Sequence, residues 1–424
     1  MDRQAFRMAC RRCGSLNVEL FLDLGEQPHC NRLIAATEAA IQEPCYPLRV
    51  GFCHDCTLVQ IDHTIPKEQM FAEYPYVSGT TRTLVKHFHD TAARLVHRYE
   101  LTRSDLVVDI GSNDGTWLAG YRPFSIRVLG VEAAANIAEI ANENGIRTWN
   151  QFFNEETADE IVGKEGHARL ITAAGVFFHL EELHSVVRGV ARLLTDDGVL
   201  CVQAIYLGGM LDNLAFDQIY HEHLCYYTLR SLEALLKQHG LEVFDVDLQP
   251  IHGGSLEVHV GKPGAHRVEP QVEAFHRMEE ERHYGRFETY QDFARQVWQL
   301  RDKLLGRLNR YADEGKTVFA YGAPAKGATL LNSFGIRTRL VQKAVEKNPM
   351  KIGYLIPGTR IPIVDERASE RPDAYLMLAW NFLEEFIEKE RTYLESGGEF
   401  VVPIPELRLI TGADLPAAPV LVAR

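Results

Sequence analysis

Short apolar runs that resemble buried strands alternate with amphipathic helical stretches along much of this chain. From position 105 each run leads into a turn and a helix, and the expected strands are Leu106–Ile110, Val128–Val131, Leu170–Ala173 and Gly198–Gln203. Amphipathic helices are expected at 81–98 and at 133–144. This alternation is typical of a parallel, doubly wound α/β sheet.

A second series of the same kind begins near Lys316. A strand at Thr317–Tyr321 leads into the loop Gly322-Ala-Pro-Ala-Lys-Gly327, and Tyr375–Leu378 is a later strand. Residues 269–311, between the two series, are charged, helical in period and poor in helix breakers. They predict a helical connector between two α/β domains.

Cysteines mark the front of the chain, because six of the eight fall within the first 56 residues. Four of them form two C-x-x-C pairs, Cys10 with Cys13 and Cys53 with Cys56, separated by 39 residues. Two such pairs are typical of a tetrahedral zinc site, and four protein ligands leave no open position, so the zinc should be structural. The remaining early cysteines, Cys30 and Cys45, have no partner at this spacing, and we interpret them as ordinary thiols.

Disulfides or a redox C-x-x-C motif are the alternatives to zinc. The chain opens without an apolar leader, which predicts a cytoplasmic protein whose thiols stay reduced. A redox motif should lie beside a thioredoxin-type strand and helix, and no such pattern is evident. We therefore expect four parts: a zinc-binding module (1–68), a first α/β domain (69–265), a helical connector (266–312) and a second α/β domain (313–424).

Composition argues against two classes of protein. Hydrophobic residues make up 46% and charged residues 24% of the 424 positions, as in a globular protein, and no run of eighteen apolar residues predicts a membrane span. The net charge of −13 argues against a nucleic-acid-binding protein, which would present a basic face.

The first glycine loop follows the strand Leu106–Ile110 and contains Gly111 and Gly115. Glu132 closes the next strand, 21 positions after Gly111, where a carboxylate can accept hydrogen bonds from both ribose hydroxyls. The dinucleotide fingerprint G-x-G-x-x-G is absent. The form D-x-G-x-x-x-G resembles the nucleoside-binding loop of S-adenosylmethionine-dependent methyltransferases, and a flavin or nicotinamide fold is the alternative.

A row of polar side chains, Tyr220, His221, Glu222 and His223, follows the strand that ends near Gln203. A solvated surface helix, a structural histidine pair or a metal site could each account for it. Its position after strands whose carboxyl ends form a ligand crevice favours a functional site, and His179 follows another of these strands. Histidine is suited to proton abstraction at neutral pH.

The second glycine loop suits a pyrophosphate. Backbone N–H groups at a helix start and the ammonium of Lys326 would face the phosphates. The alternative is a tight strand–helix turn with Lys326 merely solvated.

The ordered set of these motifs resembles a known family over essentially the whole chain, the three-domain sugar C-methyltransferases of deoxysugar biosynthesis. The set comprises both C-x-x-C pairs and the segments Tyr74–Ser78, Val108–Gly111, Asp217–His223, His252–Leu256, Tyr321–Gly327, Pro357–Ile363 and Trp380–Asn381. The resemblance implies a zinc-binding module, a Rossmann-like class I methyltransferase domain and a C-terminal second Rossmann-like α/β domain. It also implies S-adenosylmethionine, structural Zn²⁺ and a nucleotide-linked 4-keto-6-deoxyhexose substrate.

The resemblance further implies the chemistry. His223 would remove the proton beside the keto group, at carbon 3, and the enolate would attack the methyl group of the sulfonium. Tyr220 or His179 would donate to the enolate oxygen, Glu222 would hold the sugar or orient a neighbour, and Tyr76 would cap the donor or the sugar. The positions implied for the methyl donor are Asp109, Gly111, Ser112, Asn113, Gly115 and Glu132, and those implied for the nucleotide end are Lys326, Asn332, Arg360 and Asn381.

Two departures from the family concern the sugar pocket. The family often has asparagines where this chain has Ala174 and Gly175, and an acid at Gln203. A nicotinamide-dependent nucleotide-sugar oxidoreductase or epimerase, and a zinc-ribbon adaptor for nucleic acid, are the competing functions. We expect a monomer, since one chain carries both nucleotide folds.

Overall fold

The computed structural model describes residues 8–38, 40–71, 74, 76–80, 82–251 and 254–415. Pro75, His252 and Gly253, which belong to two of the motifs above, lie outside the described residues. The chain divides into two compact units, which are described separately. The first comprises Met1–Leu22, Arg49–Met210 and His221–Tyr290, and the second Asp23–Leu48, Leu211–Tyr220 and Gln291–Arg424.

A seven-stranded sheet in the order β11-β12-β9-β8-β5-β6-β7 forms the centre of the first unit. Its parallel strands are β5 (Leu106–Ile110), β6 (Arg127–Glu132), β7 (Thr148–Asn150), β8 (Ala168–Ala174) and β9 (Leu194–Ile205). The four strands expected from the apolar runs are thereby confirmed. Antiparallel β11 (Glu242–Gln249) and β12 (Ser255–Gly261) extend the sheet beyond β9.

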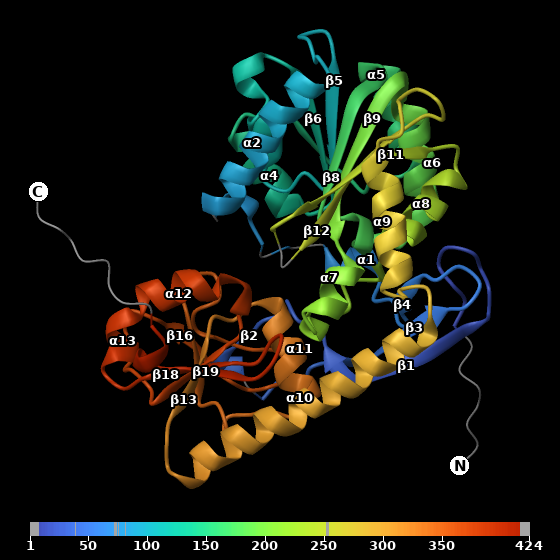
Figure 1. The fold of residues 1–424 in the computed structure, drawn as a ribbon. Helices are drawn as coiled ribbons and strands as arrows, with labels where there is room; N and C mark the ends of the chain where they lie inside the picture. Colours follow the sequence, from blue (N-terminus) through green and yellow to red (C-terminus); the bar gives the residue numbers. More distant parts are fainter. Residues whose placement is uncertain are drawn as a thin grey trace, which may run out of the picture. The chain divides into compact units, whose positions relative to one another are not determined.

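Helices cover both faces of this sheet (Figure 1). One face carries α2 (Arg82–Arg98), α3 (Thr116–Ala119) and α4 (Ala135–Glu143), and the other carries α5 (Glu155–Glu165), α6 (Leu183–Leu193) and α8 (Leu229–Lys237). Shorter α1 (Lys67–Met70) and α7 (Leu207–Asp212) lie in connections. The helix α2 buries apolar residues three or four positions apart, which is the spacing of one helical face. They are Leu84, Phe88, Ala92 and Leu95.

A four-stranded sheet in the order β1-β3-β4-β10 carries the cysteine pairs. Its strands are β1 (Val18–Pro28), β3 (Cys45–Cys53), β4 (Val59–Ile61) and β10 (Cys225–Tyr226). The strand β10 comes from the first α/β domain, two residues after His223, and pairs antiparallel with β4 through Cys225 and Gln60. The sheet of the cysteine module therefore holds the chain directly after the histidine cluster.

The second unit has a six-stranded sheet in the order β16-β14-β13-β17-β18-β19. Its strands are β13 (Val318–Tyr321), β14 (Lys343–Glu346), β16 (Ile363–Asp365), β17 (Ala374–Met377), β18 (Glu399–Val402) and antiparallel β19 (Arg408–Ile410). In chain order the five parallel strands read 3-2-1-4-5, the order of a Rossmann fold. Its helices are α11 (Ala325–Ser333), α12 (Leu383–Lys389) and α13 (Arg391–Glu395), and β2 (Ile34–Ala35) pairs with β15 (Tyr354–Leu355).

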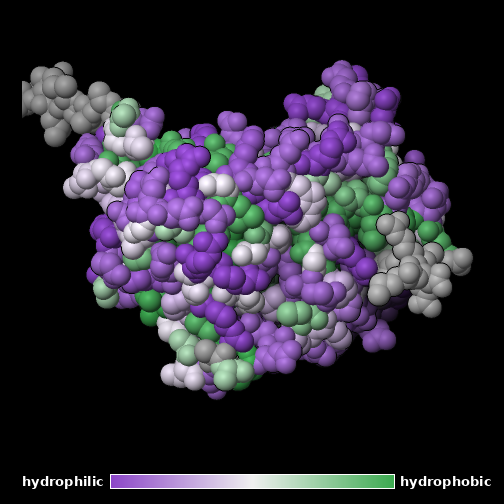
Figure 2. Space-filling view, turned by 90° about the horizontal axis from the view of Figure 1, so that it is seen from below, coloured by the Kyte–Doolittle hydropathy of each residue, from purple (hydrophilic) through white to green (hydrophobic). Residues whose placement is uncertain are grey.

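The expected connector is helical. It consists of α9 (Pro270–Glu281), in the first unit, and α10 (Phe287–Asp313), which enters the second unit at Gln291. Among the described residues no helix combines the length and apolar character needed to span a bilayer. The face drawn in Figure 2 is mostly hydrophilic, with scattered apolar patches.

A buried carboxylate joins α2 to the sheet of the first unit. Glu257 on β12 is 0% exposed and accepts two hydrogen bonds from Arg94 of α2, at 2.7 and 2.8 Å. Gln203 of β9 donates to it at 2.8 Å, and His259, itself bonded to Tyr99, lies at 3.0 Å. The side-chain amide of Gln203 is thus engaged inside the protein.

We expect Glu257→Gln to lower the free energy of unfolding by about 1–3 kcal/mol at neutral pH, the range for a hydrogen bond to a charged group. Burial alone would raise the pKa of Glu257, but the hydrogen bond from His259, together with the charges of His259 and Arg94, lowers it to about 2. The stabilisation is therefore complete above the unfolded pKa near 4.5 and is lost as the pH falls toward 2. Urea unfolding across this range measures the difference, and Asp90→Asn, in an exposed pair with Lys86, should leave stability unchanged. Equal stability of wild type and Glu257→Gln at pH 7 would contradict this expectation.

Candidate active site and zinc site

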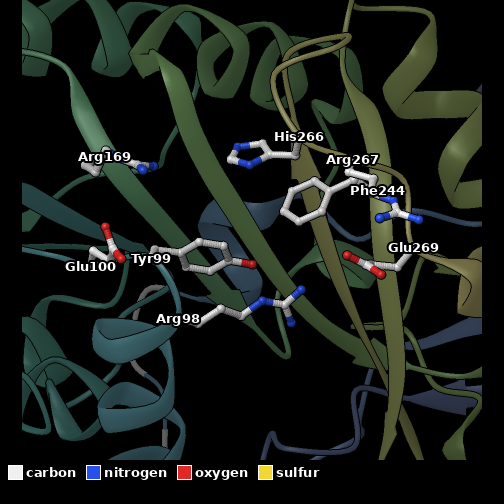
Figure 3. Close-up of a pocket in the computed structure, with 8 residues that line it drawn as sticks. All are labelled: Arg98, Tyr99, Glu100, Arg169, Phe244, His266, Arg267 and Glu269. Atoms are coloured by element: carbon white, nitrogen blue, oxygen red, sulfur yellow. The ribbon is translucent and has the colours of Figure 1, made fainter.

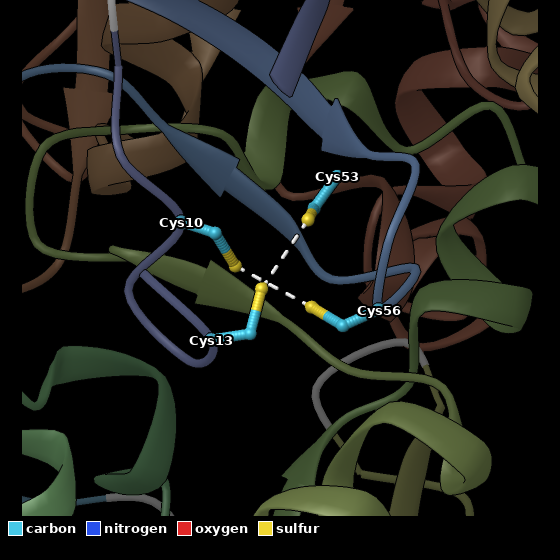
Figure 4. A group of neighbouring side chains, drawn as sticks. All are labelled: Cys10, Cys13, Cys53 and Cys56. Carbon is cyan, nitrogen blue, oxygen red and sulfur yellow. Dashed lines mark hydrogen bonds between the residues drawn. The ribbon is translucent and has the colours of Figure 1, made fainter. Parts of the chain in front are cut away.

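The four predicted zinc ligands lie together (Figure 4). Their sulfur atoms are all within 4.8 Å of one another, with Cys10 Sγ 3.4 Å from Cys56 Sγ and Cys13 Sγ 3.6 Å from Cys53 Sγ. A tetrahedron with Zn–S bonds of about 2.3 Å requires sulfur separations of roughly 3.8 Å, so the donor set fits zinc. The protein binds Zn²⁺ through these thiolates, and Cys30 and Cys45 stand apart from the group.

The first glycine loop has the geometry that its glycines predict. Gly111 (φ 66°) and Gly115 (φ 78°) lie in the left-handed region, and a Cβ atom would come within 2.9 Å of Val176 or 2.8 Å of Ile146, respectively. The N–H of Gly111 donates to the carbonyl of Val131 at 2.8 Å. The loop therefore turns tightly over the carboxyl end of β6.

Glu132 ends β6 and holds this loop. Its Oε2 accepts from the backbone N–H of Asn113 and its Oε1 from that of Ala134, both at 2.9 Å. Burial raises the pKa of Glu132, and the backbone donors oppose that effect. Each carboxylate oxygen accepts one of these two hydrogen bonds and retains a second lone pair.

Asp109 and Ser112, two of the residues predicted to bind the methyl donor, point into the protein beneath the loop. Asp109 accepts a hydrogen bond from Thr172 at 2.6 Å, and burial raises the pKa of Asp109 to about 7. The buried hydroxyl of Ser112 occupies the space left by Gly130, where a Cβ atom would lie 2.5 Å from it. Both residues therefore support the loop from below.

The segment before α2 is hydrogen-bonded to the first glycine loop, which contains Gly111 and Gly115 and is the donor loop of this unit. The side chain of Asn113 accepts from Ser78 N at 2.8 Å and donates to the carbonyl of Tyr76 at 3.1 Å. Asn136 of α4 bonds both the N–H and the carbonyl of Tyr74, at 3.2 and 2.9 Å. Tyr76 is 41% exposed beside the loop.

The histidine cluster occupies a turn before β10 rather than a helix or strand. His223 is buried, and its ring stacks on that of His179 with 5.2 Å between the ring centres. The ring centre of Phe178 lies 4.5 Å from that of His223. Burial lowers the pKa of His179 to about 4, although Glu222 acts to raise it, so this imidazole is neutral at physiological pH. Its Nε2 is buried and has no hydrogen-bond partner among the described residues.

Glu222 joins the cluster to the fastened segment. Its buried carboxylate accepts from the hydroxyl of Tyr74 at 2.9 Å. Sequence analysis did not select Tyr74 or Asn136 as site residues, although Tyr74 opens one of the family motifs. Tyr220 belongs to the second unit, at the end of its segment Leu211–Tyr220.

In the second unit two of the four predicted substrate residues meet. Lys326 Nζ donates to Asn381 Oδ1 at 2.6 Å and lies 4.1 Å from the ring centre of Trp380. Trp380 donates to buried Asp217 at 2.7 Å. The other two stabilise a separate loop: Asn332 donates to the carbonyl of Pro357, and Arg360 to that of Ile41.

Figure 3 shows a cavity of about 300 Å³ in the first unit. It lies at the amino ends of the parallel strands, whereas the glycine loop lies at their carboxyl ends. Its lining residues are Arg98, Tyr99, Glu100, Arg169, Phe244, His266, Arg267 and Glu269. Arg98 pairs with Asp245 at 2.6 Å and Arg169 with Asp197 at 3.3 Å, so the charge of these two arginines is largely neutralised. The cavity is remote from the glycine loop and from the histidine cluster.

Comparison with known proteins identifies the family. The chain is 37% identical over 405 residues to the C-methyltransferase NovU of Streptomyces niveus, covering 95% of this chain and 96% of that protein. The chain belongs to this C-methyltransferase family. Family models match in order: a zinc binding domain at 10–71, a methyltransferase domain at 84–246 and a C-methyltransferase C-terminal domain at 250–405.

More distant similarities concern only part of this C-methyltransferase. The uncharacterized methyltransferase YcgJ of Bacillus subtilis is 29% identical over 96 residues, 22% of this chain and 37% of that protein. Its crystal structure covers 42% of this chain and 100% of its own at 16% identity and a TM-score of 0.32. Magnesium protoporphyrin IX methyltransferase from Synechocystis covers 42% and 79% at 13% identity and a TM-score of 0.32.

The family assignment decides between two readings of the first glycine loop. The C-methyltransferase uses S-adenosylmethionine, and neither an oxidoreductase nor a nucleic-acid adaptor is among these relatives. S-adenosylmethionine supplies the methyl group when bound.

We expect purified protein to carry one zinc per chain, measured by metal analysis. Cys53→Ser should lose the metal and melt at a lower temperature, because the free energy of zinc binding is part of the folding free energy of such modules. Cys45→Ser is the matched control and should retain full zinc. Retention of zinc by Cys53→Ser would contradict the assignment of the four ligands.

Proposed function

We propose that this C-methyltransferase moves the methyl group of S-adenosylmethionine to carbon 3 of a nucleotide-linked 4-keto-6-deoxy sugar. The observation that carries the proposal is the stacked pair of His179 and His223, joined through Glu222 and Tyr74 to the segment that the donor loop fastens. A base for carbon acidity is thereby linked to a methyl-donor site within one unit.

His223 is the proposed base. It takes the proton from carbon 3, and the electron pair forms an enolate whose oxygen is on carbon 4. Carbon 3 then attacks the methyl group, the bond from methyl to sulfur breaks, and S-adenosylhomocysteine leaves. The rings of Phe178 and His179 pack against the imidazole of His223 and fix its position.

His179 is the proposed hydrogen-bond donor to the enolate oxygen. A neutral imidazole with a buried Nε2 can present an N–H there, and one well-placed donor is worth roughly 3–4 kcal/mol in the transition state. The family resemblance offers Tyr220 as the other candidate donor. Glu222 and Tyr74 orient the cluster.

The donor site is built around Glu132. Its two remaining acceptor positions match the two hydroxyls of the ribose. The side chain of Asn113 holds the backbone of Tyr76, whose ring would cover the bound donor. Asp109 and Ser112 support the loop from beneath. We assign residues 69–265 to donor binding and residues 313–424 to the nucleotide of the sugar, in a chain that acts as a monomer.

The nucleotide end is proposed to bind at the second glycine loop. Lys326 supplies the cation for the pyrophosphate, and Asn381 positions it through the 2.6 Å hydrogen bond. Asn332 and Arg360 shape this end by stabilising the loop after Pro357. Because the chain carries a net charge of −13, a local cation is needed for a dianionic ligand.

We expect His223→Asn to lower kcat by about 10²–10⁴, the usual contribution of a general base. The direct readout is exchange of the carbon 3 proton with deuterated water, followed by NMR, with S-adenosylhomocysteine in place of the methyl donor. The variant should lose this exchange but bind S-adenosylhomocysteine with unchanged affinity. His184→Asn, on the surface beside His239, is the control and should keep full exchange. Wild-type exchange in His223→Asn would refute the base.

We expect the affinity for thymidine diphosphate to fall as the pH rises through about 8. Burial lowers the pKa of Lys326 to about 8, although the charge of Asp217 opposes this, and only the protonated ammonium attracts the pyrophosphate. Calorimetric titration from pH 7 to 9.5 measures the effect. Lys326→Met should bind weakly without this pH dependence, whereas Lys343→Met, on a surface pair with Glu370, should behave as wild type. A flat wild-type profile would contradict the role of Lys326.

A further inference from the structure

The second unit repeats the backbone arrangement of the donor loop. Gly322 follows β13 with φ 79°, and its N–H donates to the carbonyl of Val345 at 2.9 Å. In the first unit, Gly111 follows β5 and donates to the carbonyl of Val131 at 2.8 Å. In both sheets, therefore, the glycine that follows the first strand donates a backbone hydrogen bond to the end of the second strand.

The residue after that carbonyl is a glutamate in both cases. Glu346 ends β14, 24 positions after Gly322, as Glu132 ends β6, 21 positions after Gly111. The Oε2 atom of Glu346 accepts from the backbone N–H of Ala323, within the glycine loop, at 3.0 Å. An acid at the end of the second strand is the position that contacts the sugar ring of a nucleotide in Rossmann folds.

The second glycine of the loop has the packing role expected at a nucleotide site. A Cβ atom on Gly327 would lie 2.9 Å from Leu378, so this glycine lets α11 approach the end of β17. The helix is nine residues long, and its first N–H groups face the loop. The loop, the helix start and the carboxylate therefore lie together at the carboxyl ends of β13 and β14.

Charged groups flank the same loop. Lys351 donates to the carbonyl of Ala323 at 2.9 Å, and Lys326 lies in the first turn of α11. Asp217, whose charge acts on Lys326, is 0% exposed, and its Oδ1 has no hydrogen-bond partner among the described residues. A buried carboxylate oxygen without a donor indicates a place for a ligand hydroxyl, amide or water.

The two glutamates differ in how many acceptor positions remain. Glu132 has one backbone donor on each oxygen, which leaves two positions. In Glu346 the Oε1 atom already accepts from both Lys347 N, at 2.8 Å, and Asn348 N, at 3.0 Å. Since a carboxylate oxygen offers two lone pairs, only Oε2 of Glu346 retains one position among the described residues.

We propose that Glu346 is the sugar-ring contact of a nucleoside diphosphate in the second unit, and that it accepts a hydrogen bond from a single ring hydroxyl through Oε2. The inference rests on the proposed function, which places the nucleotide end of the substrate on this unit. It assigns a residue that the sequence motifs did not single out. It also gives the second site a hydroxyl count different from that of the donor site.

The test is a ligand series on one base, titrated calorimetrically into the full-length zinc-loaded protein. The ligands are 5-methyluridine diphosphate with two ring hydroxyls, thymidine diphosphate with one, and 3′-deoxythymidine diphosphate with none. We expect one drop in affinity, of roughly 10- to 100-fold, somewhere along the series, as for loss of a hydrogen bond to a charged acceptor. The other step should change affinity less than about threefold, because no acceptor remains for a second hydroxyl.

Glu346→Gln keeps only an uncharged partner for the hydroxyl, so the drop should shrink to less than about 10-fold. Asp373→Asn is the matched control, because the carboxylate of Asp373 also accepts a hydrogen bond from a backbone N–H, that of Thr317. This pair lies at the amino ends of the strands of the same sheet, away from the glycine loop. This control should reproduce the wild-type series. Glu132→Gln should lose affinity for S-adenosylhomocysteine and keep the series, which separates the two sites.

Equal affinities along the wild-type series would overturn the contact, and two drops of similar size would overturn the single acceptor. A drop of undiminished size in Glu346→Gln would assign the hydroxyl to another residue. Failure of all three diphosphates to bind, while S-adenosylhomocysteine binds, would overturn both this inference and the nucleotide-linked substrate but leave methyl transfer intact. Failure of S-adenosylhomocysteine to bind would instead count against the donor site.

Discussion

The carboxylate at the end of the second strand is the constraint on which both ligand edges depend. A glycine loop that exposes backbone N–H groups to a ligand would otherwise be free to adopt many conformations. Glu132 fixes the loop after β5 through Asn113 N, and Glu346 fixes the loop after β13 through Ala323 N. The same side chain that orders each loop also retains acceptor capacity, so in the proposed function loop geometry and ligand recognition are coupled in one group.

Further side-chain hydrogen bonds to the backbone fix the chain around the donor loop. Asn113 holds the chain at Tyr76 and Ser78, and Asn136 holds it at Tyr74, whose hydroxyl reaches Glu222. The histidine cluster is therefore positioned from two directions. The pairing of β10 with β4 anchors it from the cysteine module.

Much of the fold could be predicted from local pattern. The strand Leu106–Ile110 was predicted to the residue, because it is apolar on both faces and bounded by Asp105 and Gly111. The zinc ligands followed from spacing alone. By contrast, β10 has only two residues and no period, and the contact of Tyr74 with Asn136 joins residues 62 positions apart. Glu346 was missed because β14 is short and begins with Lys343, so its apolar run is only two residues long.

The pairing of β10 with β4 has a consequence for how this enzyme can be divided or recombined. The cysteine module looks like a detachable front segment, yet one strand of its sheet is supplied by residues Cys225–Tyr226 of the methyltransferase segment. A chain cut before the methyltransferase segment would leave that strand with its hydrogen-bonding edge open, next to the histidines. Modular exchange between relatives should therefore transfer the module and the turn at His221–Leu224 together, as one inherited piece.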